Sequence, residues 1–221
     1  IIPAYNEEKS IGKVVEDIPR DIVSHVIVVN NNSNDSTVQV ASDAGAIVLD
    51  EEQRGYGWAC LKGIEHSKTL NTEIVVFLDG DYSDYPQEIP DVIAPILSDQ
   101  MDMVIGSRVL GKREKGSLTP QQVFGNWLAT KLIRLFYRTK FTDLGPFRAI
   151  KAEKLETLKM SDKTYGWTIE MQIKAAKHKM KFCEVPVNYK KRIGVSKVSG
   201  TLKGTLFAGI KIIFAVFKYR F

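Results

Sequence analysis

Short runs of β-branched and other apolar residues alternate along the chain with segments in which apolar residues recur every three or four positions. The runs predict strands and the periodic segments predict helices, because side chains repeat every 2 residues in a strand and every 3.6 in a helix. The expected strands are Ile1–Pro3, Val26–Val29, Ala46–Leu49, Ile74–Leu78, Met103–Ile105, Phe147–Ile150 and Phe182–Tyr189. The expected helices are Glu7–Ile18, Asp35–Ala44, Gly57–Ser67, Pro90–Leu97, Phe124–Tyr137 and Ile169–His178. This alternation predicts an α/β fold with a Rossmann-like, mostly parallel sheet flanked by helices.

The composition is that of an ordinary folded protein, with 221 residues, 44% hydrophobic and 26% charged. These values exclude a collagen, a disordered chain and a coiled coil. The two cysteines, Cys60 and Cys183, are too few for a disulfide-stabilised secreted scaffold and favour a reducing compartment. We expect one domain over residues 1–199 and a C-terminal amphipathic, membrane-associated helix over residues 200–221.

Polar side chains follow four of the expected strands. The clusters are Tyr5-Asn6-Glu7, Asn30–Asp35, Asp79-Gly80-Asp81 and Ser107-Arg108. In open parallel sheets, ligands bind at the carboxyl ends of the strands. The sequence therefore predicts that these four clusters meet at one edge of the sheet and form one ligand site.

Two carboxylates, Asp79 and Asp81, flank a glycine directly after an apolar strand. Such a pair is costly unless a cation lies between the charges, and Mg²⁺ binds through one or two carboxylates together with substrate phosphates. The alternative is a simple turn or helix cap, in which Asp and Gly are also common. The pattern thus favours a site for Mg²⁺ or Mn²⁺ but leaves the turn open.

The order and spacing of the motifs resemble family 2 glycosyltransferases of the GT-A fold, and within them the dolichyl-phosphate mannose and glucose synthase group. The matching segments span nearly the whole chain: Ile2–Glu8, Val28–Asp35, Asp79–Asp81, Ile105–Arg108, Thr142–Arg148, Glu184–Val187 and Arg192–Lys197. Each segment is short, so the resemblance depends on their common order. It implies an inverting, metal-dependent transfer of a sugar from a UDP- or GDP-sugar to a polyprenyl phosphate such as dolichyl or undecaprenyl phosphate.

The resemblance also implies a role for individual residues. It places Asp79 and Asp81 as metal ligands, and it gives Asp81 and Asp143 catalytic roles, with Asp143 near the acceptor. The residues implied in nucleotide binding are Pro3, Tyr5, Glu7, Val29, Asn30, Asn31, Asp79 and Gly80. The residues implied in phosphate binding are Arg108, Arg192 and Lys197.

Three positions depart from the family pattern. Asn30 and Asn31 stand where a pair of aspartates is usual, so the base preference is open, although an Asn carbonyl can also accept a hydrogen bond. Ser83 stands where some relatives carry a glutamine metal ligand. Arg192 and Lys197 are five residues apart, whereas eukaryotic mannose synthases have a spacing of six.

The expected chemistry depends on the acceptor. A cation held by Asp79 and Asp81, with Arg108 nearby, would stabilise the negative charge that develops on a departing diphosphate. A lipid phosphate is already an anion near neutral pH and needs positioning rather than a strong base. A hydroxyl acceptor in cell-envelope glycan synthesis would need a base, for which Asp143 is the candidate; its other interpretation is a turn residue before Gly145.

Charge is distributed unevenly, and this suggests contact with an anionic surface. Residues 171–221 hold 12 Lys and Arg residues and one acid, whereas the first 170 residues have a net charge of −6. Phe124–Tyr137 and Leu202–Arg220 both mix cations with aromatic residues, as amphipathic helices at membrane surfaces do. The alternative is that both helices pack their apolar side on the sheet. We expect a protein at the cytoplasmic face of a membrane.

Other classes of function fit less well. An inactive nucleotide-binding module at the membrane is compatible with Asn30 and Asn31, but the intact Asp79 and Asp81 argue against it. No helix-turn-helix pattern or aromatic platform for single strands is evident, so we expect no nucleic acid partner. No GxGxxG sequence follows the first strand, which disfavours a nicotinamide-dependent dehydrogenase.

Overall fold

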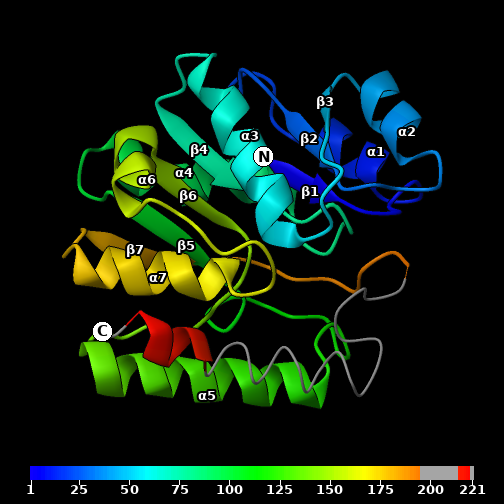
Figure 1. Ribbon diagram of the computed structural model, residues 1–221. Helices are drawn as coiled ribbons and strands as arrows, with labels where there is room; N and C mark the ends of the chain where they lie inside the picture. Colours follow the sequence, from blue (N-terminus) through cyan, green and yellow to red (C-terminus); the bar gives the residue numbers. More distant parts are fainter. Residues whose placement is uncertain (195–213, 220–221) are drawn as a thin grey trace.

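The protein is described by a computed structural model that covers residues 1–194 and 214–219 (Figure 1). Three parallel strands form one part of the sheet, in the order β1-β2-β3. A second group of strands follows in the order β4-β6-β5-β7. The strands are β1 (Ile2–Ala4), β2 (Ile27–Asn30), β3 (Ile47–Asp50), β4 (Ile74–Phe77), β5 (Met103–Ser107), β6 (Arg148–Lys151) and β7 (Phe182–Pro186). All seven expected strands are therefore present, with ends shifted by one to three residues.

Backbone hydrogen bonds connect the two groups of strands at β1 and β4. The amino group of Ile1 donates to the carbonyl of Val76 at 2.7 Å, and the N–H of Leu78 donates to the carbonyl of Ile1 at 3.2 Å. Because β1 lies beside β4, the clusters that follow these two strands come out next to each other at the same edge.

The prediction of a mostly parallel sheet is confirmed, with β6 as the exception. β6 runs antiparallel to both β4 and β5. The reason lies in the connection before it: the chain leaves β5 at the edge that carries the site, and Gly106 is hydrogen-bonded there to Phe147, just before β6 begins. A segment that leaves and re-enters a sheet at the same edge must start the next strand in the opposite direction.

Helices cover both faces of the sheet, as predicted. They are α1 (Ile11–Glu16), α2 (Thr37–Asp43), α3 (Tyr56–Lys68), α4 (Ile89–Leu97), α5 (Pro120–Tyr137), α6 (Ala152–Leu158) and α7 (Trp167–Lys177), with the 3₁₀ turn η1 at Pro86–Glu88. Residues of α3, α5, α6 and α7 pack with one face of the sheet, and residues of α1, α2 and α4 pack with the other. The packing buries two apolar cores with the sheet between them.

Three helices differ from the expected ones. α1 begins at Ile11 rather than Glu7, because Glu7 accepts the N–H of Ser10 in a turn before the helix. α5 begins four residues early, at Pro120, where Thr119 and Gln122 cap each other's backbone N–H groups. The short helix α6 was not predicted at all, since it buries only Leu155 and Leu158.

The predicted C-terminal helix over residues 200–221 lies mostly outside the described residues. Its described part, residues 214–219, packs between α5 and α7 (Figure 1). Ala215 and Val216 are buried, and the carbonyl of Val216 accepts a hydrogen bond from the Tyr137 hydroxyl at 2.6 Å. Within residues 1–194 and 214–219, no helix combines the length and the apolar character needed to cross a bilayer.

Candidate active site

A cavity of about 300 Å³ lies at the carboxyl ends of β1, β2 and β4, where the sequence predicted a ligand site. Most residues predicted for the donor line it: Pro3, Tyr5, Glu7, Asn31, Asp79, Gly80, Asp81 and Arg192. A larger cavity of about 430 Å³ lies at the other ends of these strands and is lined mainly by aliphatic side chains. The charged groups of the first cavity, not the size of the second, identify the candidate site.

The loops after β1 and β2 are fastened to each other on one side of the cavity. The N–H of Asn6 donates to Ser33 Oγ at 2.9 Å, and the N–H of Asn34 donates to Asn6 Oδ1 at 2.8 Å. Asn6 has a φ of 54°, a left-handed conformation that asparagine tolerates better than most residues. The turn lets Tyr5 line the cavity, where the guanidinium of Arg54 lies 5.3 Å from the centre of its ring.

Asn30 and Asn31, which replace the usual aspartates, use their side chains within the protein. Asn30 donates to Asp50 Oδ1 at 2.8 Å, a contact that a carboxylate at position 30 would turn into repulsion. Asn31 donates to the carbonyl of Gln53 at 2.7 Å and accepts the N–H of Gly55 at 2.7 Å. Asn31 thus lines the cavity and holds the adjoining loop, whereas Asn30 does not line it.

Asp79, Asp81 and Asp84 form an acidic group, of which Asp79 and Asp81 line the cavity. Oδ1 of Asp79 and both carboxylate oxygens of Asp84 are buried without a hydrogen-bond partner among the described residues. Burial, followed by the charge of Asp81, raises the pKa of Asp79 to about 6, although Arg192 opposes the shift. Burial, with Asp79 and Asp81, also raises the pKa of Asp84 well above its usual value. The positive groups that oppose these shifts are Arg192 and Arg108.

Asp81 is the member of this group that is already bound on both oxygens. Its Oδ1 accepts the N–H of Ser83 at 3.0 Å and also the Ser83 hydroxyl. Its Oδ2 lies 2.8 Å from Nη1 of Arg192. Ser83, the position of a possible third ligand, is fully buried and instead orients Asp81.

The residues present fit a divalent cation. Asp79 offers a buried oxygen without a partner, and Asp81 offers a second carboxylate whose Oδ2 faces a cation already. No group of three or more acidic, His or Cys side chains in residues 1–194 and 214–219 could hold a metal by itself. A cation bound here would take its other ligands from water and from substrate phosphates, as Mg²⁺ commonly does.

Gly80 lets the loop after β4 pack closely against β1. A Cβ at this position would lie 3.3 Å from the carbonyl oxygen of Pro3. The close approach keeps the loop after β4 against the loop after β1, which brings Asp79 and Tyr5 to the same cavity.

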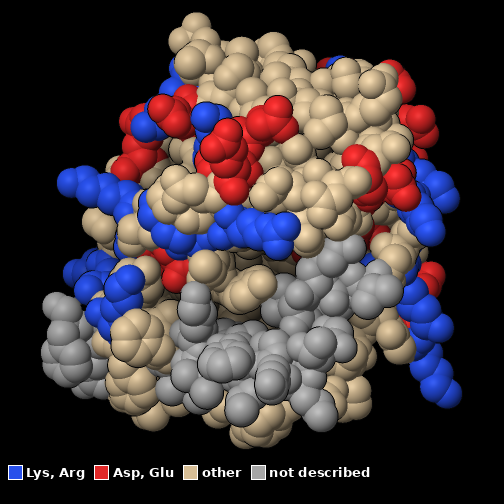
Figure 2. Space-filling view, turned by 45° about the vertical axis from the view of Figure 1, so that its right-hand side comes forward, with Lys and Arg blue, Asp and Glu red and all other residues tan. Residues whose placement is uncertain are grey.

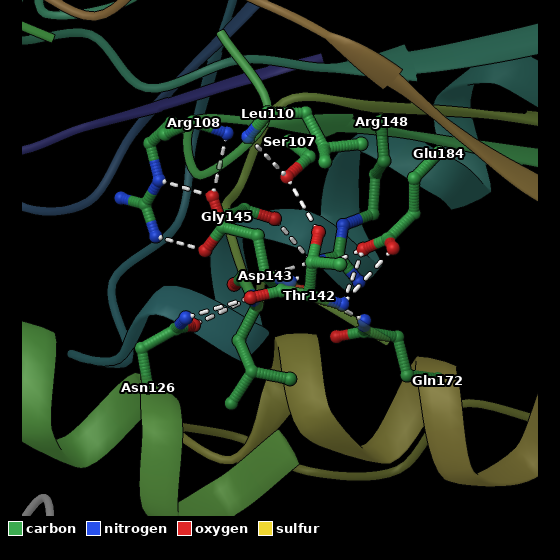
Figure 3. A network of polar contacts seen from close by, with 11 residues as sticks. Ser107, Arg108, Leu110, Asn126, Thr142, Asp143, Gly145, Arg148, Gln172 and Glu184 are labelled. Carbon is green, nitrogen blue, oxygen red and sulfur yellow. Dashed lines mark hydrogen bonds and ion pairs between the residues drawn. The ribbon is translucent and has the colours of Figure 1, made fainter. Parts of the chain in front are cut away.

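Arg108 and Asp143 form a buried ion pair (Figure 3). Nε and Nη2 of Arg108 donate to the two oxygens of Asp143 at 2.8 and 2.7 Å, and the Arg108 backbone N–H adds a third bond at 2.8 Å. Burial would raise the pKa of Asp143, but the charge and hydrogen bonds of Arg108 lower it below its usual value. The side chains are 12% and 1% exposed.

This pairing changes two of the expectations from the sequence. Asp143 is held on both oxygens and closed to solvent, so it is not available as a general base in this structure. Arg108 is directed at Asp143 and does not line the cavity, so it is not placed to bind the donor phosphates directly. Arg148, which is also buried, donates to the carbonyls of Thr168, Leu144 and Gly145 rather than to Asp143.

The loop 142–145 around Asp143 is held by three further elements (Figure 3). Glu184 of β7 accepts the N–H groups of Thr142 and Asp143 at 2.9 and 3.1 Å. Asn126 of α5 accepts the N–H of Leu144 at 2.8 Å, and Gln172 of α7 donates to the carbonyl of Asp143 at 2.8 Å. The sequence did not reveal this frame, because its members lie far apart along the chain.

Some predicted residues lie elsewhere. Val29 is fully buried and packs with Ile27 and Ala59, so its side chain cannot contact a nucleotide. Lys197 lies outside the described residues. Glu170 of α7 also lies away from the cavity: it accepts hydrogen bonds from Ser161 and Asp162 and pairs with Lys174.

Six residues of the cavity were not predicted: Ala4, Arg54, Gly55, Tyr56, Ala59 and Tyr165. The signal for three of them was the sequence Gly55-Tyr56-Gly57 at the start of α3. A Cβ on Gly55 or Gly57 would lie 2.2 or 2.0 Å from a carbonyl oxygen of Lys163 or Asp162. The glycines therefore let the loop 162–166 cross the start of α3, and this crossing brings Tyr165 to the cavity.

Comparison with known proteins places the chain in a family. A model of the family described as Glycosyl transferase family 2 matches residues 1–159. An uncharacterised glycosyltransferase of Mycobacterium tuberculosis is 33% identical over 211 residues, which cover 94% of this chain and 92% of that protein. A UDP-N-acetylglucosamine–dolichyl-phosphate N-acetylglucosaminyltransferase of Methanococcus voltae is 28% identical over 210 residues, covering 85% of this chain and 83% of that one.

Solved structures share the fold. The glucosyl-3-phosphoglycerate synthase of Mycobacterium tuberculosis, crystallised with Mn²⁺, UDP and glucosyl-3-phosphoglycerate, has a TM-score of 0.76 and 21% identity. The match covers 99% of this chain and 77% of that one. The GT-A fold expected from the sequence is confirmed.

Proposed function

Since the chain belongs to glycosyltransferase family 2, we propose that it moves a sugar from a UDP- or GDP-sugar to a polyprenyl phosphate, with inversion at the anomeric carbon. The relative from Methanococcus voltae, by its name, uses a UDP-sugar and dolichyl phosphate. The argument from this chain's own residues has three parts: the donor cavity, the acceptor and the membrane.

The donor side rests on the cavity at Asp79 and Asp81. Tyr5, Glu7 and Asn31 line the end of the cavity formed by β1 and β2, where the base and ribose would lie. Asp79 and Asp81 would hold Mg²⁺ or Mn²⁺, which would neutralise the charge of the leaving diphosphate. Arg192, at the same cavity, adds a positive group for the phosphates.

The acceptor side rests on the single observation that carries the proposal: the acids behind the metal ligands cannot serve as a general base. Asp143 is bound by Arg108, and Glu184 accepts two backbone N–H groups. Asp84 is fully buried, and its raised pKa favours the neutral acid. A hydroxyl acceptor needs a base, whereas a lipid phosphate arrives with its negative charge.

The exposed side of α5 supports placement at the cytoplasmic face of a membrane. Val123, Phe124, Trp127 and Leu135 are 43 to 70% exposed, and the rings of Phe124 and Trp127 lie 5.8 Å apart. Exposed cations accompany them along the helix: Lys131, Arg134 and Arg138. Aromatic and aliphatic residues with interleaved cations suit an anionic bilayer surface.

The charge distribution agrees with this placement. On the face drawn in Figure 2, Lys and Arg side chains form a band below a group of Asp and Glu side chains. A basic band attracts anionic headgroups and would orient the protein on a bilayer. The free thiols Cys60 and Cys183 are compatible with a reducing compartment.

The test of the acceptor uses purified protein, Mn²⁺, a panel of UDP- and GDP-sugars, and undecaprenyl phosphate in detergent. We expect a lipid-linked sugar, detected by mass spectrometry, with one of the donors. Undecaprenol, which lacks the phosphate, is the matched control and should give no product. Transfer to undecaprenol or to glycan hydroxyls, with none to the lipid phosphate, would contradict the proposed acceptor.

The test of the membrane surface uses sedimentation with vesicles that contain phosphatidylglycerol. We expect the protein to bind these vesicles, and the variant Phe124→Ser with Trp127→Ser to bind at least about fivefold more weakly. A matched control is Ile22→Ser, because Ile22 is also 43% exposed but lies away from α5. Equal binding by the α5 variant and the wild type would contradict the surface.

A further inference from the structure

We infer that Arg192 and the divalent cation compete for Oδ2 of Asp81, so that the cation binds as its complex with a diphosphate rather than alone. This inference rests on the proposed donor and metal site and adds the order in which that site fills. It gives Arg192 two positions: bound to Asp81 before the donor arrives, and bound to the diphosphate afterwards.

The first observation is that Asp81 has no unoccupied oxygen. Ser83 donates its backbone N–H and its hydroxyl to Oδ1, and both groups are buried. Oδ2 lies 2.8 Å from Nη1 of Arg192. A cation that binds Asp81 must therefore take the place of the guanidinium at Oδ2, since like charges at that distance repel.

The second observation is the state of Asp79. Its Oδ1 is buried without a partner, while Oδ2 of Asp81 is satisfied. Arg192 thus supplies part of the positive charge that two neighbouring carboxylates require, but it reaches only one of them by an ion pair. The negative charge of Asp79 and Asp81 is therefore only partly neutralised, and Oδ1 of Asp79 is left as a ligand for a doubly charged cation.

The third observation is that the segment Lys190–Ile193 is fastened alongside the turn that carries Asp81. The N–H of Ile193 donates to the carbonyl of Asp81, and the N–H of Lys190 donates to the carbonyl of Ser83, both at 2.9 Å. The ammonium of Lys190 lies 3.2 Å from the ring centre of Tyr82. These contacts fix the backbone on both sides of Arg192 and aim its side chain at Asp81.

The guanidinium leaves Oδ2 readily only when another anion receives it. A diphosphate offers several charged oxygens and matches the planar fork of an arginine. Arg192 lines the donor cavity and is 24% exposed at its side chain, so it can turn from Asp81 toward a ligand there. A metal–diphosphate complex brings both replacements together: a cation for Asp81 and an anion for Arg192.

The experiment measures Mn²⁺ binding, by the electron paramagnetic resonance signal of free Mn²⁺, with and without UDP. Arg192→Gln is compared with wild type and with Lys191→Gln, whose exposed side chain neighbours Arg192 without pairing with Asp81. We expect Arg192→Gln to bind Mn²⁺ alone about tenfold more tightly than wild type, and Mn²⁺ with UDP about tenfold less tightly. Lys191→Gln should match wild type in both measurements.

A second variant keeps the guanidinium but weakens its attachment. Ile193→Pro removes the N–H that donates to Asp81. We expect tighter binding of Mn²⁺ alone and nearly unchanged binding with UDP. Circular dichroism confirms that each variant is folded, and a variant that is not folded is replaced by the other.

Equal or weaker binding of Mn²⁺ alone in Arg192→Gln would overturn the competition. So would a parallel change with and without UDP, because the inference requires changes of opposite sign. The sugar-transfer assay with wild-type protein tests the proposed function separately. If wild type transfers sugar but Arg192→Gln binds Mn²⁺ as wild type does, the competition is refuted and the proposed function stands.

Discussion

Two groups of acidic side chains lie behind the same edge of the sheet, and they differ in how their charge is matched. Asp143 and Glu184 receive hydrogen bonds from Arg108, Thr142 and the backbone of Asp143 itself. Asp79 and Asp84 have buried oxygens without partners in the described part of the chain. The carboxylates of the first group thus have partners within the protein, whereas those of the second group have oxygens without partners among the residues described.

This difference distinguishes acidic residues that stabilise the fold from acidic residues that are available to bind a ligand. Buried charges that are paired add to the definition of a fold, while buried charges that are unpaired raise its energy and persist where a ligand compensates them. The sequence could not make this distinction, since Asp79, Asp81 and Asp143 all follow expected strands or precede turns. In the structure Asp143 is paired with Arg108, whereas Asp79 keeps a buried oxygen without a partner among the described residues and is proposed, with Asp81, to hold a cation.

The largest effect is expected when Asp79→Asn and Asp81→Asn are combined in one variant. We expect sugar transfer to fall by at least about a thousandfold, because the cation loses both protein carboxylates. We expect only a small change in the melting temperature, because a partnerless buried charge is removed at Asp79 while the ion pair of Asp81 with Arg192 is lost. The measurement is kcat/KM with Mn²⁺ beside the melting temperature. Asp91→Asn, on the exposed side of α4, is the control, and activity within tenfold of wild type would contradict the assignment.

The matching test on the other group is Asp143→Ala. We expect the free energy of unfolding to fall by about 3–5 kcal/mol, because the guanidinium of Arg108 is left buried without its partner. Urea unfolding followed by circular dichroism measures the loss. Replacing Arg108 by Met in the same protein should recover part of it, since the unpaired charge is then absent. A loss below about 1 kcal/mol would show that the ion pair of Arg108 and Asp143 does not stabilise the fold appreciably.

The pH dependence of stability should carry the signature of Asp79. Its pKa is raised from 3.8 to about 6 in the folded protein, so the folded state binds more protons than the unfolded state between these values. The metal-free protein should therefore lose stability as pH rises from 4 to 6, by up to about 3 kcal/mol from this group.

Asp79→Asn removes that contribution, and it also lowers the pKa of Asp84, because the charge of Asp79 is one cause of the raised pKa of Asp84. The difference in unfolding free energy between wild type and variant should shrink at pH 4.5 and grow at pH 7, with the wild type the less stable. Mn²⁺ with UDP at pH 7 should restore the wild type only. A difference that does not vary with pH would contradict the raised pKa.

The smallest expected effect is that of Glu184→Gln. Its carboxylate accepts the N–H groups of Thr142 and Asp143, and a neutral amide accepts such bonds less strongly. We expect a loss of about 1–2 kcal/mol in unfolding free energy, with a modest fall in kcat. Glu153→Gln, which is exposed on α6, provides the control and should change the free energy by less than about 0.5 kcal/mol.

The positions of the strands along the chain could be predicted from the sequence, because runs such as Ile74–Phe77 are apolar and the polar clusters follow them. The direction of β6 could not, since the two-residue repeat is the same in parallel and antiparallel strands. α6 was missed for a related reason: a helix of 7 residues with two buried leucines shows too little periodicity.

The donor cavity could be predicted in outline, because residues at the ends of parallel strands share one edge. The pairing of Arg108 with Asp143 could not, since the two residues are 35 positions apart and each alone resembles a ligand-binding residue. Tyr165 reaches the cavity only because Gly55 and Gly57 admit the loop that precedes it. Such contacts depend on tertiary packing, which leaves no local pattern.

The hydrogen bonds that hold the loop 142–145 to α5, α7 and β7 have a thermodynamic consequence. Those residues lie outside the lining of the donor cavity and are held by hydrogen bonds before any substrate arrives, so a substrate that contacts them would lose little affinity to ordering the protein. The Arg192 side chain is opposite in character, because the proposed competition exchanges its contact with Asp81 for one with the diphosphate. The entropic cost and the activation barrier of donor binding should therefore depend mainly on Arg192. Substitutions near this residue should change the rate of turnover the most.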